Sequence, residues 1–403
     1  MQIYYENQNG KIIHGDNIEV LKTFEENTVD SCISDFPYDI SFMNRDWDNT
    51  GNFYEWCKAR AVELFRVIKP GGYVAVFGHP KTNHRLKCGF EDVGFEIVEE
   101  IDWIHCTGFP KSQDIGKMFD KAVNTEMSHR YEGFKTSGLK SLHEPITIFQ
   151  KPLDGTYIQN IEKWGCGAMN IDACRVPFQN ETDFDAVKEK CNFTENSKSI
   201  GFSSTSPIYG DGNITPEQAR ECVKPGGRFP PNIILDENTA ELLDEQTGES
   251  VSIGGSGLAS KQAIVENGER VFNGHMCQAT GGYGDSGGGS RIFPIFKYCP
   301  KASPSERQLP NGKRNPHITL KPVELIKWLI KLLTPKEGLT IDVTAGSCTH
   351  GVAAEQLNRN EGYRLKWFDI EITNTESEPY CEVGKQRIAD AARQRKLFDL
   401  QSL

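Results

Sequence analysis

The sequence predicts an α/β protein built around a mostly parallel β-sheet. Apolar runs of strand length alternate with segments of helical spacing over the first ~150 residues. The same alternation returns after residue 316. Strands that alternate with helices imply βαβ units with parallel strands, so the simplest arrangement is one sheet built from both ends of the chain.

In the early part of the chain, predicted strands and helices follow one another closely. The segment 11–14 is a short apolar run, and 29–35 is a second run that ends in a turn containing Pro37. A helix over 52–68 ends at Lys69-Pro70-Gly71-Gly72, a sequence that stops a helix. The remaining predictions are strands over 73–77, 95–104 and 145–150 and helices over 17–24 and 84–93.

The late part begins with an amphipathic helix predicted over 323–333. Pro322 suits the first turn of this helix, and Thr334-Pro335 ends it. After it come a strand over 339–343, a turn of small residues over 345–347, a helix over 350–357, a strand over 364–370 and a helix over 381–396. This part therefore repeats the α/β pattern of the early part.

The middle of the chain, roughly 153–299, differs from both ends. It is rich in Gly, Ser and Asn, as in the stretch 281–290, and its periodicity is weak. Such a segment is either a separate loop-rich domain or an insertion. A chain of 403 residues is expected to form two or three folding units.

The charge of the chain bears on its partners. A formal net charge of −11 argues against a protein that coats nucleic acid through bulk charge, but it allows an enzyme with a locally basic cleft. The tract 301–331 holds seven basic residues against Glu306 and Glu324. On charge alone, this tract is more typical of a solvated face than of a nucleic-acid interface.

Composition also indicates the compartment. No stretch approaches the ~20 apolar residues that span a bilayer, so no membrane association is expected. The first residues carry neither a basic nor an apolar signal region. The 12 cysteines are scattered, with no Cys-x-x-Cys pair, so we expect free thiols, no metal site and a cytoplasmic location.

The first candidate site is Asp35-Phe36-Pro37-Tyr38, at the carboxyl end of a predicted strand, where open α/β sheets bind ligands. Asp35 and the Phe36 carbonyl offer two hydrogen-bond acceptors, Pro37 stiffens the turn, and Tyr38 provides an aromatic plate. This set suits an exocyclic amino group whose base stacks on the ring. By itself, the tetrapeptide is more typical of an ordinary strand-to-loop turn.

A second candidate is the turn within 341–349, where a strand, small residues and a helix follow one another. Gly346 permits close approach of the backbone to a ligand at the helix N-terminus, although a tight turn also needs Gly for steric reasons. Glu371 ends the next strand and is placed to accept from ribose hydroxyls. Asp16 follows the first strand, where it could accept from an adenine amino group.

Taken together, these segments resemble the β-group DNA amino-methyltransferases, in particular those of phages and prophages. In that group the catalytic tetrapeptide precedes the cofactor loop, and a target-recognition region lies between them. The matching segments, in family order, are His14-Gly15-Asp16, Ser34 to Tyr38, Val67 to Gly72, Gly108 to Ser112, His143 to Pro152, Gly227 to Pro230, Tyr298 to Ser303, His317 to Pro322, the turn at Gly346, and Glu371.

The resemblance implies a Rossmann-like S-adenosylmethionine-dependent methyltransferase sheet with one antiparallel strand and a loop-rich inserted target-recognition region. It divides the chain into 1–152 (catalytic, first part), 153–299 (target recognition) and 300–403 (catalytic, cofactor-binding part). It assigns Asp35, Phe36, Pro37 and Tyr38 to the target base. The implied cofactor-binding residues are Asp16, Thr319, Lys321, Asp342, Thr344, Ala345, Gly346, Ser347 and Glu371, with Thr319 and Lys321 near the cofactor's carboxylate end.

The sequence departs from the family pattern in three places, one of which is His317-Ile318, where the usual Pro is absent. Phe36 stands where the family usually has Pro, but the position contributes a carbonyl, which Phe supplies equally. The cofactor loop, usually Asp-Pro-Phe-x-Gly-Ser-Gly, has Val343, Thr344 and Cys348 instead of its Pro, Phe and last Gly. Thr344 removes an apolar contact, and we expect Cys348 to add bulk where the backbone approaches the ligand.

The activity implied by the resemblance is methyl transfer from S-adenosylmethionine to a flipped base in double-stranded DNA. Asp as the first tetrapeptide residue favours adenine N6, and cytosine N4 is the alternative. Two other hypotheses remain: a non-catalytic DNA-binding protein on a degenerate scaffold, and an RNA or protein amino-methyltransferase. A second copy of the chain and a cognate restriction endonuclease are further partners that this interpretation allows, in the cytoplasm of a bacterial host.

Overall fold

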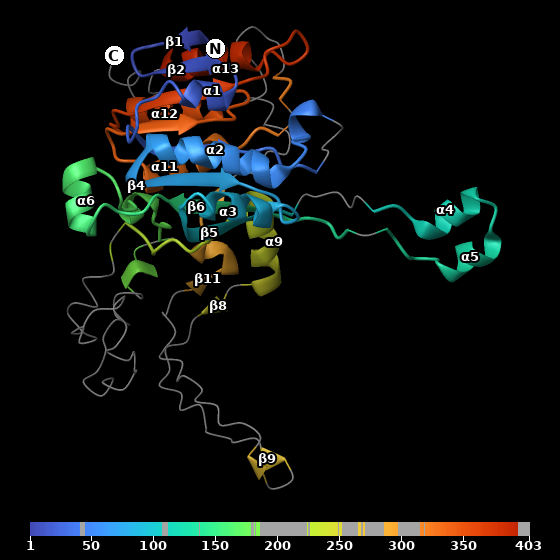
Figure 1. Cartoon of the computed structure of the whole chain (residues 1–403). Coiled ribbons are helices and arrows are strands. Elements are labelled where there is room, and N and C mark those ends of the chain that lie inside the picture. The colour runs from blue at the N-terminus through green and yellow to red at the C-terminus, as the bar shows by residue number, and fades with distance from the viewer. Residues whose placement is uncertain are drawn as a thin grey trace, which may run out of the picture. The chain divides into compact units, whose positions relative to one another are not determined.

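The computed structural model describes residues 1–40, 45–106, 112–136, 138–178, 181, 183–185, 224, 226–248, 250–251, 265–266, 269–270, 286–296, 315–317 and 319–393. Within these ranges, ten strands form one mixed sheet (Figure 1) in the order β1-β2-β14-β13-β3-β4-β6-β5-β7-β12. The strands are β1 (Gln2–Glu6), β2 (Gly10–His14), β3 (Val29–Asp35), β4 (Ile68–Phe77), β5 (Glu96–Ile104), β6 (His143–Gln150), β7 (Ile233–Asp236), β12 (Ile295–Phe296), β13 (Leu339–Asp342) and β14 (Lys366–Glu371).

The sheet confirms the predicted α/β class. Strands β2, β14, β13, β3 and β4 run parallel to one another, and β5, β7 and β12 are also mutually parallel. Strand β6 is antiparallel to both of its neighbours, β4 and β5. The edge strand β1 is a second antiparallel strand, because a tight turn returns it directly onto β2.

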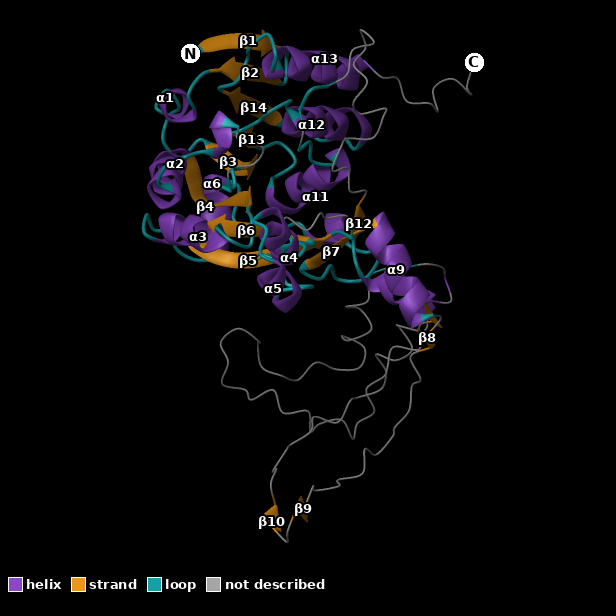
Figure 2. Ribbon diagram, turned by 90° about the vertical axis from the view of Figure 1, so that its right-hand side faces the viewer, coloured by secondary structure: helices purple, strands orange, loops and turns teal. Residues whose placement is uncertain are grey.

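Two layers of helices cover the sheet, one on each face (Figure 2). One layer contains α1 (Asn17–Leu21), α2 (Phe53–Val67) and α3 (Asn83–Glu91), and the other contains α11 (Val323–Leu333), α12 (Thr349–Asn360) and α13 (Tyr380–Arg393). No helix within the described ranges is both long enough and apolar enough to span a bilayer.

Successive strand residues point to opposite faces and so enter different cores. Ile148 belongs to the core beneath α11 and α12, whereas Phe149 belongs to the core beneath α2 and α3. Alternation along a strand whose two faces are both covered produces the continuous apolar runs seen in the sequence. The rings of Phe149 and Phe90 stack with centroids 4.3 Å apart, which ties α3 to β6.

Several elements were not predicted from the sequence. Helices α4 (Ile115–Lys121) and α5 (Thr125–Arg130) lie in a polar stretch, and α5 buries no residue, so neither leaves a clear apolar period. Helix α6 (Tyr157–Trp164) and strands β7 and β12 lie in the segment interpreted as irregular, yet both strands join the sheet. The predicted helix over 381–396 ends at Arg393, and 394–396 lies outside the described residues.

The chain divides into two compact units. The first comprises Met1–Cys174, Pro231–Thr239 and Ile295–Leu403, and the second comprises Arg175–Pro230 and Ala240–Pro294. Within the second unit, β8 (Ser250–Val251) pairs with β11 (Ser286–Gly287), and β9 (Val265–Glu266) pairs with β10 (Glu269–Arg270). The boundaries predicted at 152 and 299 stay predictions, whereas 153–174, β7 and β12 belong to the unit that contains the sheet.

Removal of the Phe149 ring tests the packing between α3 and the sheet. Phe149→Ala leaves a cavity beside Phe90, so the free energy of unfolding should fall by about 3–5 kcal/mol in denaturant titrations. Phe134, which is 60% exposed, is the matched control. Phe134→Ala should change the free energy by less than about 0.5 kcal/mol, and equal losses in the two variants would contradict this account of the core.

Candidate active site

The carboxyl ends of β3 and β13 meet, although the two strands are about 300 residues apart in the chain. The strands pair in parallel through Thr340 with Ser31 and Ile341 with Cys32. Beyond the paired residues, the Ser34 hydroxyl donates to Asp342 Oδ1 at 2.6 Å and lies 2.7 Å from the Thr344 hydroxyl. The two turns predicted to form the site therefore lie side by side.

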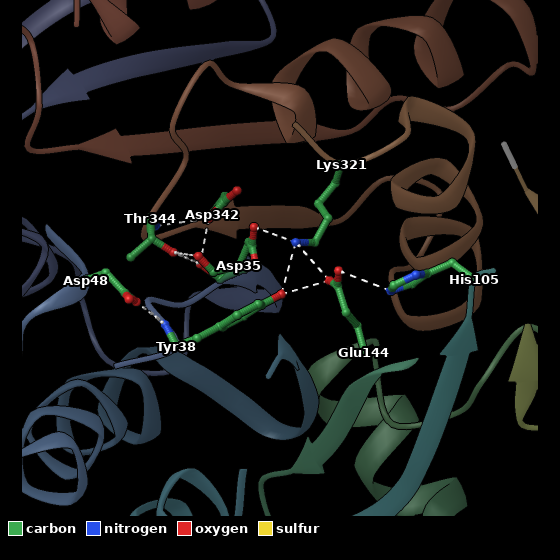
Figure 3. Close-up of polar contacts among 9 residues, drawn as sticks. Asp35, Tyr38, Asp48, His105, Glu144, Lys321, Asp342 and Thr344 are labelled. Carbon is green, nitrogen blue, oxygen red and sulfur yellow. Dashed lines mark hydrogen bonds and ion pairs between the residues drawn. The ribbon is translucent and has the colours of Figure 1, made fainter. Parts of the chain in front are cut away.

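The Asp35 side chain faces a buried ammonium group. Lys321 Nζ donates to Asp35 Oδ2 at 2.8 Å and to the Tyr38 hydroxyl at 3.0 Å (Figure 3). The other oxygen, Asp35 Oδ1, is buried and has no hydrogen-bond partner among the described residues. Burial raises the pKa of Asp35, and the Lys321 charge partly offsets that rise. This carboxylate therefore has an oxygen that can accept a hydrogen bond, and it binds a proton more tightly than an exposed aspartate does.

Phe36 is a core residue, although it lies within the predicted tetrapeptide. The residue is 2% exposed, and its ring packs edge-on against Trp56, with centroids 5.2 Å apart, and against Phe90. The ring is therefore occupied by the core and is not available to a ligand. The contact of the Phe36 carbonyl with a base stays a prediction, as does the role of Pro37.

Asp48 fixes the turn that carries Tyr38, and sequence reasoning missed it. Its carboxylate accepts from the backbone N–H groups of Tyr38, Asp39 and Ile40 at 2.8, 2.9 and 3.1 Å. Thr82 adds a bond to the Tyr38 carbonyl at 2.8 Å. Asp48 lies in a polar stretch with no strand or helix period, so only the folded chain reveals that it holds the turn.

Glu144 provides a second carboxylate next to Tyr38 and Lys321. It lies on β6 and accepts from the Tyr38 hydroxyl at 2.8 Å, while its carboxylate is 3.2 Å from Lys321 Nζ (Figure 3). His105 Nε2 is 3.8 Å from the other oxygen of Glu144. The segment His143 to Ile146 was noted in the sequence as a family match, but no role was assigned to Glu144.

At the late turn, Glu371 holds the backbone in place. Its carboxylate accepts from the Gly346 N–H and from the Thr373 N–H, each at 2.6 Å. Gly346 has a φ of +52°, and a Cβ added there would lie 2.4 Å from His317 Nε2, so both conformation and space require Gly. The expected contact of Glu371 with ribose hydroxyls stays a prediction, and its observed partners are these two amides.

Asp16 and Asn17 lie beside this turn, at the carboxyl end of β2. Asp16 Oδ1 caps α1 by accepting from Ile18 N at 2.9 Å and from Glu19 N at 3.2 Å. Asn17, which sequence reasoning missed, donates to the Val343 carbonyl at 2.9 Å. Asn17 Oδ1 is buried and lacks a partner within the described part of the chain, so it can accept a bond from a ligand.

The structure corrects the expectation for Cys348. The residue takes a left-handed conformation with a φ of +60°, and its thiol is fully buried. A Cβ added at Gly384 on α13 would lie 2.3 Å from the sulfur, so the thiol fills the space against that helix. The bulk of Cys348 therefore enters the core and not the surface of the turn where the backbone would approach a ligand.

The remaining predicted residues lie in different surroundings. Ala345 is buried, and the Ser347 hydroxyl is within bonding distance of Asn315 and Arg387. Thr319 is half-buried. Lys321 lies among the acceptor residues described above, and its expected position near the carboxylate end of a cofactor stays a prediction.

Comparison with known proteins gives one family. Residues 29–385 match the N6/N4 methyltransferase family, described as DNA methylase. The type II methyltransferase M.HindIII of Haemophilus influenzae is 26% identical over 200 residues, which are 40% of this chain and 64% of that protein. M.HpaI of Haemophilus parainfluenzae is 28% identical over 118 residues, which are 27% and 36%. The chain thus spans less than two thirds of the length of these relatives.

Solved structures that the chain matches include the PvuII DNA methyltransferase, described as cytosine-N4-specific. It is 15% identical with a TM-score of 0.43, over 96% of this chain and 95% of that chain. A DNA modification methylase from Thermus thermophilus, complexed with S-adenosyl-L-methionine, is 13% identical with a TM-score of 0.40, over 96% and 97%.

The titration of Glu371 should appear in the stability of the ligand-free protein. Burial raises the pKa of Glu371 to about 7, despite the two amide bonds that lower it, whereas an unfolded Glu titrates near 4.3. The folded state therefore binds this proton more tightly, and the resulting stability is complete below about pH 4.3 and is lost as pH rises through about 7.

The variant Glu371→Gln removes this loss, since it carries no charge at any pH. Between pH 5 and pH 8 its free energy of unfolding should gain about 2 kcal/mol relative to the unchanged protein, measured by urea titration at each pH. The exposed Glu96→Gln is the control and should show no such gain. A constant difference between Glu371→Gln and the unchanged protein over this range contradicts the assignment.

Proposed function

Because the chain belongs to the N6/N4 DNA methylase family, we propose that it is an S-adenosylmethionine-dependent DNA methyltransferase that methylates adenine N6 of a flipped base in duplex DNA. The observation that carries this proposal is the buried, unpartnered Oδ1 of Asp35, beside the turn that would hold the cofactor. The bond from the Thr344 hydroxyl to the Asp35 carbonyl, at 3.0 Å, joins the two half-sites.

The acceptor half-site suits an exocyclic amino group. The lone pair of such a nitrogen is delocalised into the ring, so the nitrogen is a weak nucleophile. Asp35 Oδ1 and the Phe36 carbonyl would accept its two hydrogens and favour a tetrahedral nitrogen with a localised lone pair. Tyr38, whose backbone is bound by Asp48 and Thr82, would stack on the base.

The residues of the late turn fit the proposed cofactor. Asn17 Oδ1 supplies a buried acceptor without a partner in the described chain, suited to an amino group such as that of adenine, and Asp16 is adjacent. Each oxygen of Glu371 retains a lone pair beyond its amide bond, which suits ribose hydroxyls. The segment 344–347, with Asp342, would hold the methionine part, for which Gly346 leaves room.

The reaction requires orientation more than a nucleophilic side chain. When bound, the cofactor supplies an electrophilic methyl group on a sulfonium sulfur. In the transfer, the amino nitrogen would gain a nitrogen–carbon bond as the sulfur–carbon bond breaks, and it would carry a positive charge until a proton departs. Asp35 would take that proton, and its pKa, raised by burial, suits this role.

Adenine is proposed over cytosine because Asp begins the tetrapeptide, which is more usual of adenine enzymes. The early acceptor turn and the late cofactor turn support assignment to the β group, of phage or prophage type, in the cytoplasm of a bacterial host. The segment 153–299 and the part 301–314 of the basic tract are the proposed DNA contacts, and over half of the first and all of the second lie outside the described residues. Farther along the tract, Lys321 and Lys327 are buried and Lys331 pairs with Glu361, so these three lysines do not form the exposed basic surface that the sequence suggested. A second copy and a cognate restriction endonuclease are proposed further partners.

The product identifies the target base. The chain is incubated with S-adenosylmethionine and unmethylated duplex DNA, and the DNA is digested to nucleosides for mass spectrometry. We expect N6-methyldeoxyadenosine. N4-methyldeoxycytidine would correct the base but keep the reaction. Absence of methyl transfer to DNA, RNA and protein alike supports the non-catalytic scaffold.

Substitution of Asp35 tests the acceptor half-site. Asp35→Ala should lower the rate of methyl transfer by about 100-fold or more, because the amino group loses an acceptor and the proton loses its base. Binding of S-adenosylmethionine, measured by calorimetry, should change little. Asp92→Asn, on the exposed end of α3, is the control and should keep full activity. Full activity of Asp35→Ala contradicts the assignment.

A further inference from the structure

The acceptor half-site contains two carboxylates and one ammonium group. Glu144 and Asp35 both approach Lys321 Nζ, at 3.2 and 2.8 Å, and the side chains of Lys321 and Glu144 are 9% and 16% exposed. The Tyr38 hydroxyl lies among all three groups (Figure 3). Charges placed this far from water interact strongly, so the pairing of Lys321 sets the electrostatics at Asp35.

Lys321 donates to the same carboxylate that a target amino group would use, but to its other oxygen. Its nitrogen donates to Asp35 Oδ2 and to the Tyr38 hydroxyl, whereas the nitrogen of a target base would donate to Asp35 Oδ1. An ammonium group is a stronger partner for a carboxylate than a neutral aromatic amine. A lysine with no other anion nearby would therefore stay on Asp35 and weaken it as an acceptor.

Glu144 gives the ammonium group another partner. Burial acts to raise the pKa of Glu144, but Lys321, the Tyr38 hydroxyl and His105 more than offset this, and the pKa is lowered. The pKa of Asp35, by contrast, is raised. Glu144 is thus a second counter-ion of Lys321 beside Asp35, and the three groups carry a net charge of −1 when all are ionised. That charge favours the positive nitrogen formed during transfer.

We propose that Glu144 is a positioning residue for methyl transfer. It binds the Lys321 ammonium group and the Tyr38 hydroxyl, and it attracts Lys321 away from Asp35 when a target amino group enters. This inference rests on the proposed function. Glu144 itself touches neither the base nor the cofactor, and it acts through Lys321 and Tyr38. Without Glu144, Lys321 remains paired with Asp35, and the net charge of the half-site changes from −1 to zero.

A double-mutant cycle tests this mechanism in the full chain, with radiolabelled S-adenosylmethionine and unmethylated duplex DNA. Glu144→Gln should lower kcat by about 10- to 100-fold and leave the KM for the cofactor within about threefold, since Glu144 acts on the acceptor and not on the cofactor. In a Lys321→Met background, no ammonium group is present to weaken Asp35 as an acceptor. The same substitution should therefore lower kcat by less than about threefold.

The control is Glu100→Gln on β5, which breaks a lysine–glutamate pair with Lys87 outside the site and should keep full kcat in both backgrounds. A merely structural role of Glu144 predicts equal losses with and without Lys321, and that result overturns the inference, as does an unchanged kcat of Glu144→Gln. If Glu144→Gln does not fold, Lys321→Met is compared with the double variant, which contains neither the Lys321 nor the Glu144 charge. A kcat of the double variant far below that of Lys321→Met overturns the inference.

If the chain without substitutions is inactive, the proposed function and this inference are both overturned. If that chain is active and the losses in kcat are additive, this inference alone is overturned.

Discussion

The parallel pairing of β3 with β13 is the constraint on which the rest of the site depends. It aligns the carboxyl ends of two strands that lie about 300 residues apart in the chain, so the two turns beyond them must share one space. The Ser34 hydroxyl, Asp342 and the Thr344 hydroxyl then cross-link these turns within the protein interior. Buried polar groups are costly unless they are paired, so this network fixes the two turns together.

The electrostatics of the acceptor side follow from that placement. Lys321 lies just before α11, a helix that is largely buried against the sheet. Its ammonium group contacts Asp35, the last residue of β3, which is the strand paired with β13. A buried ammonium group needs anionic partners, and Asp35 and Glu144 supply them. Because the two carboxylates share one cation, neither is fully neutralised, and Asp35 keeps a buried oxygen with no partner in the described chain.

Two departures from the family pattern, Phe36 and Cys348, direct their side chains into the core. Phe36 directs its ring between α2 and α3. Cys348 accepts a left-handed conformation and packs its thiol against Gly384. Such a conformation costs a non-glycine residue about 1 kcal/mol or more, which burial of the sulfur can offset. Each of these two side chains packs behind its turn.

The sequence by itself determined the α/β class, most of the strands and helices at both ends, and the tetrapeptide with its late partner turn. Those features are local, because apolar periodicity and turn residues depend on neighbours within a few positions. It did not locate β7, β12 or the helices α4, α5 and α6, whose segments carry little periodic signal. Only the tertiary structure decided that Lys321 faces Asp35, that Asp48 and Asn17 support the two turns, and that Glu144 enters the acceptor half-site. These contacts join residues from separate strands and loops, and sheet order, which no local pattern encodes, is what brings them together.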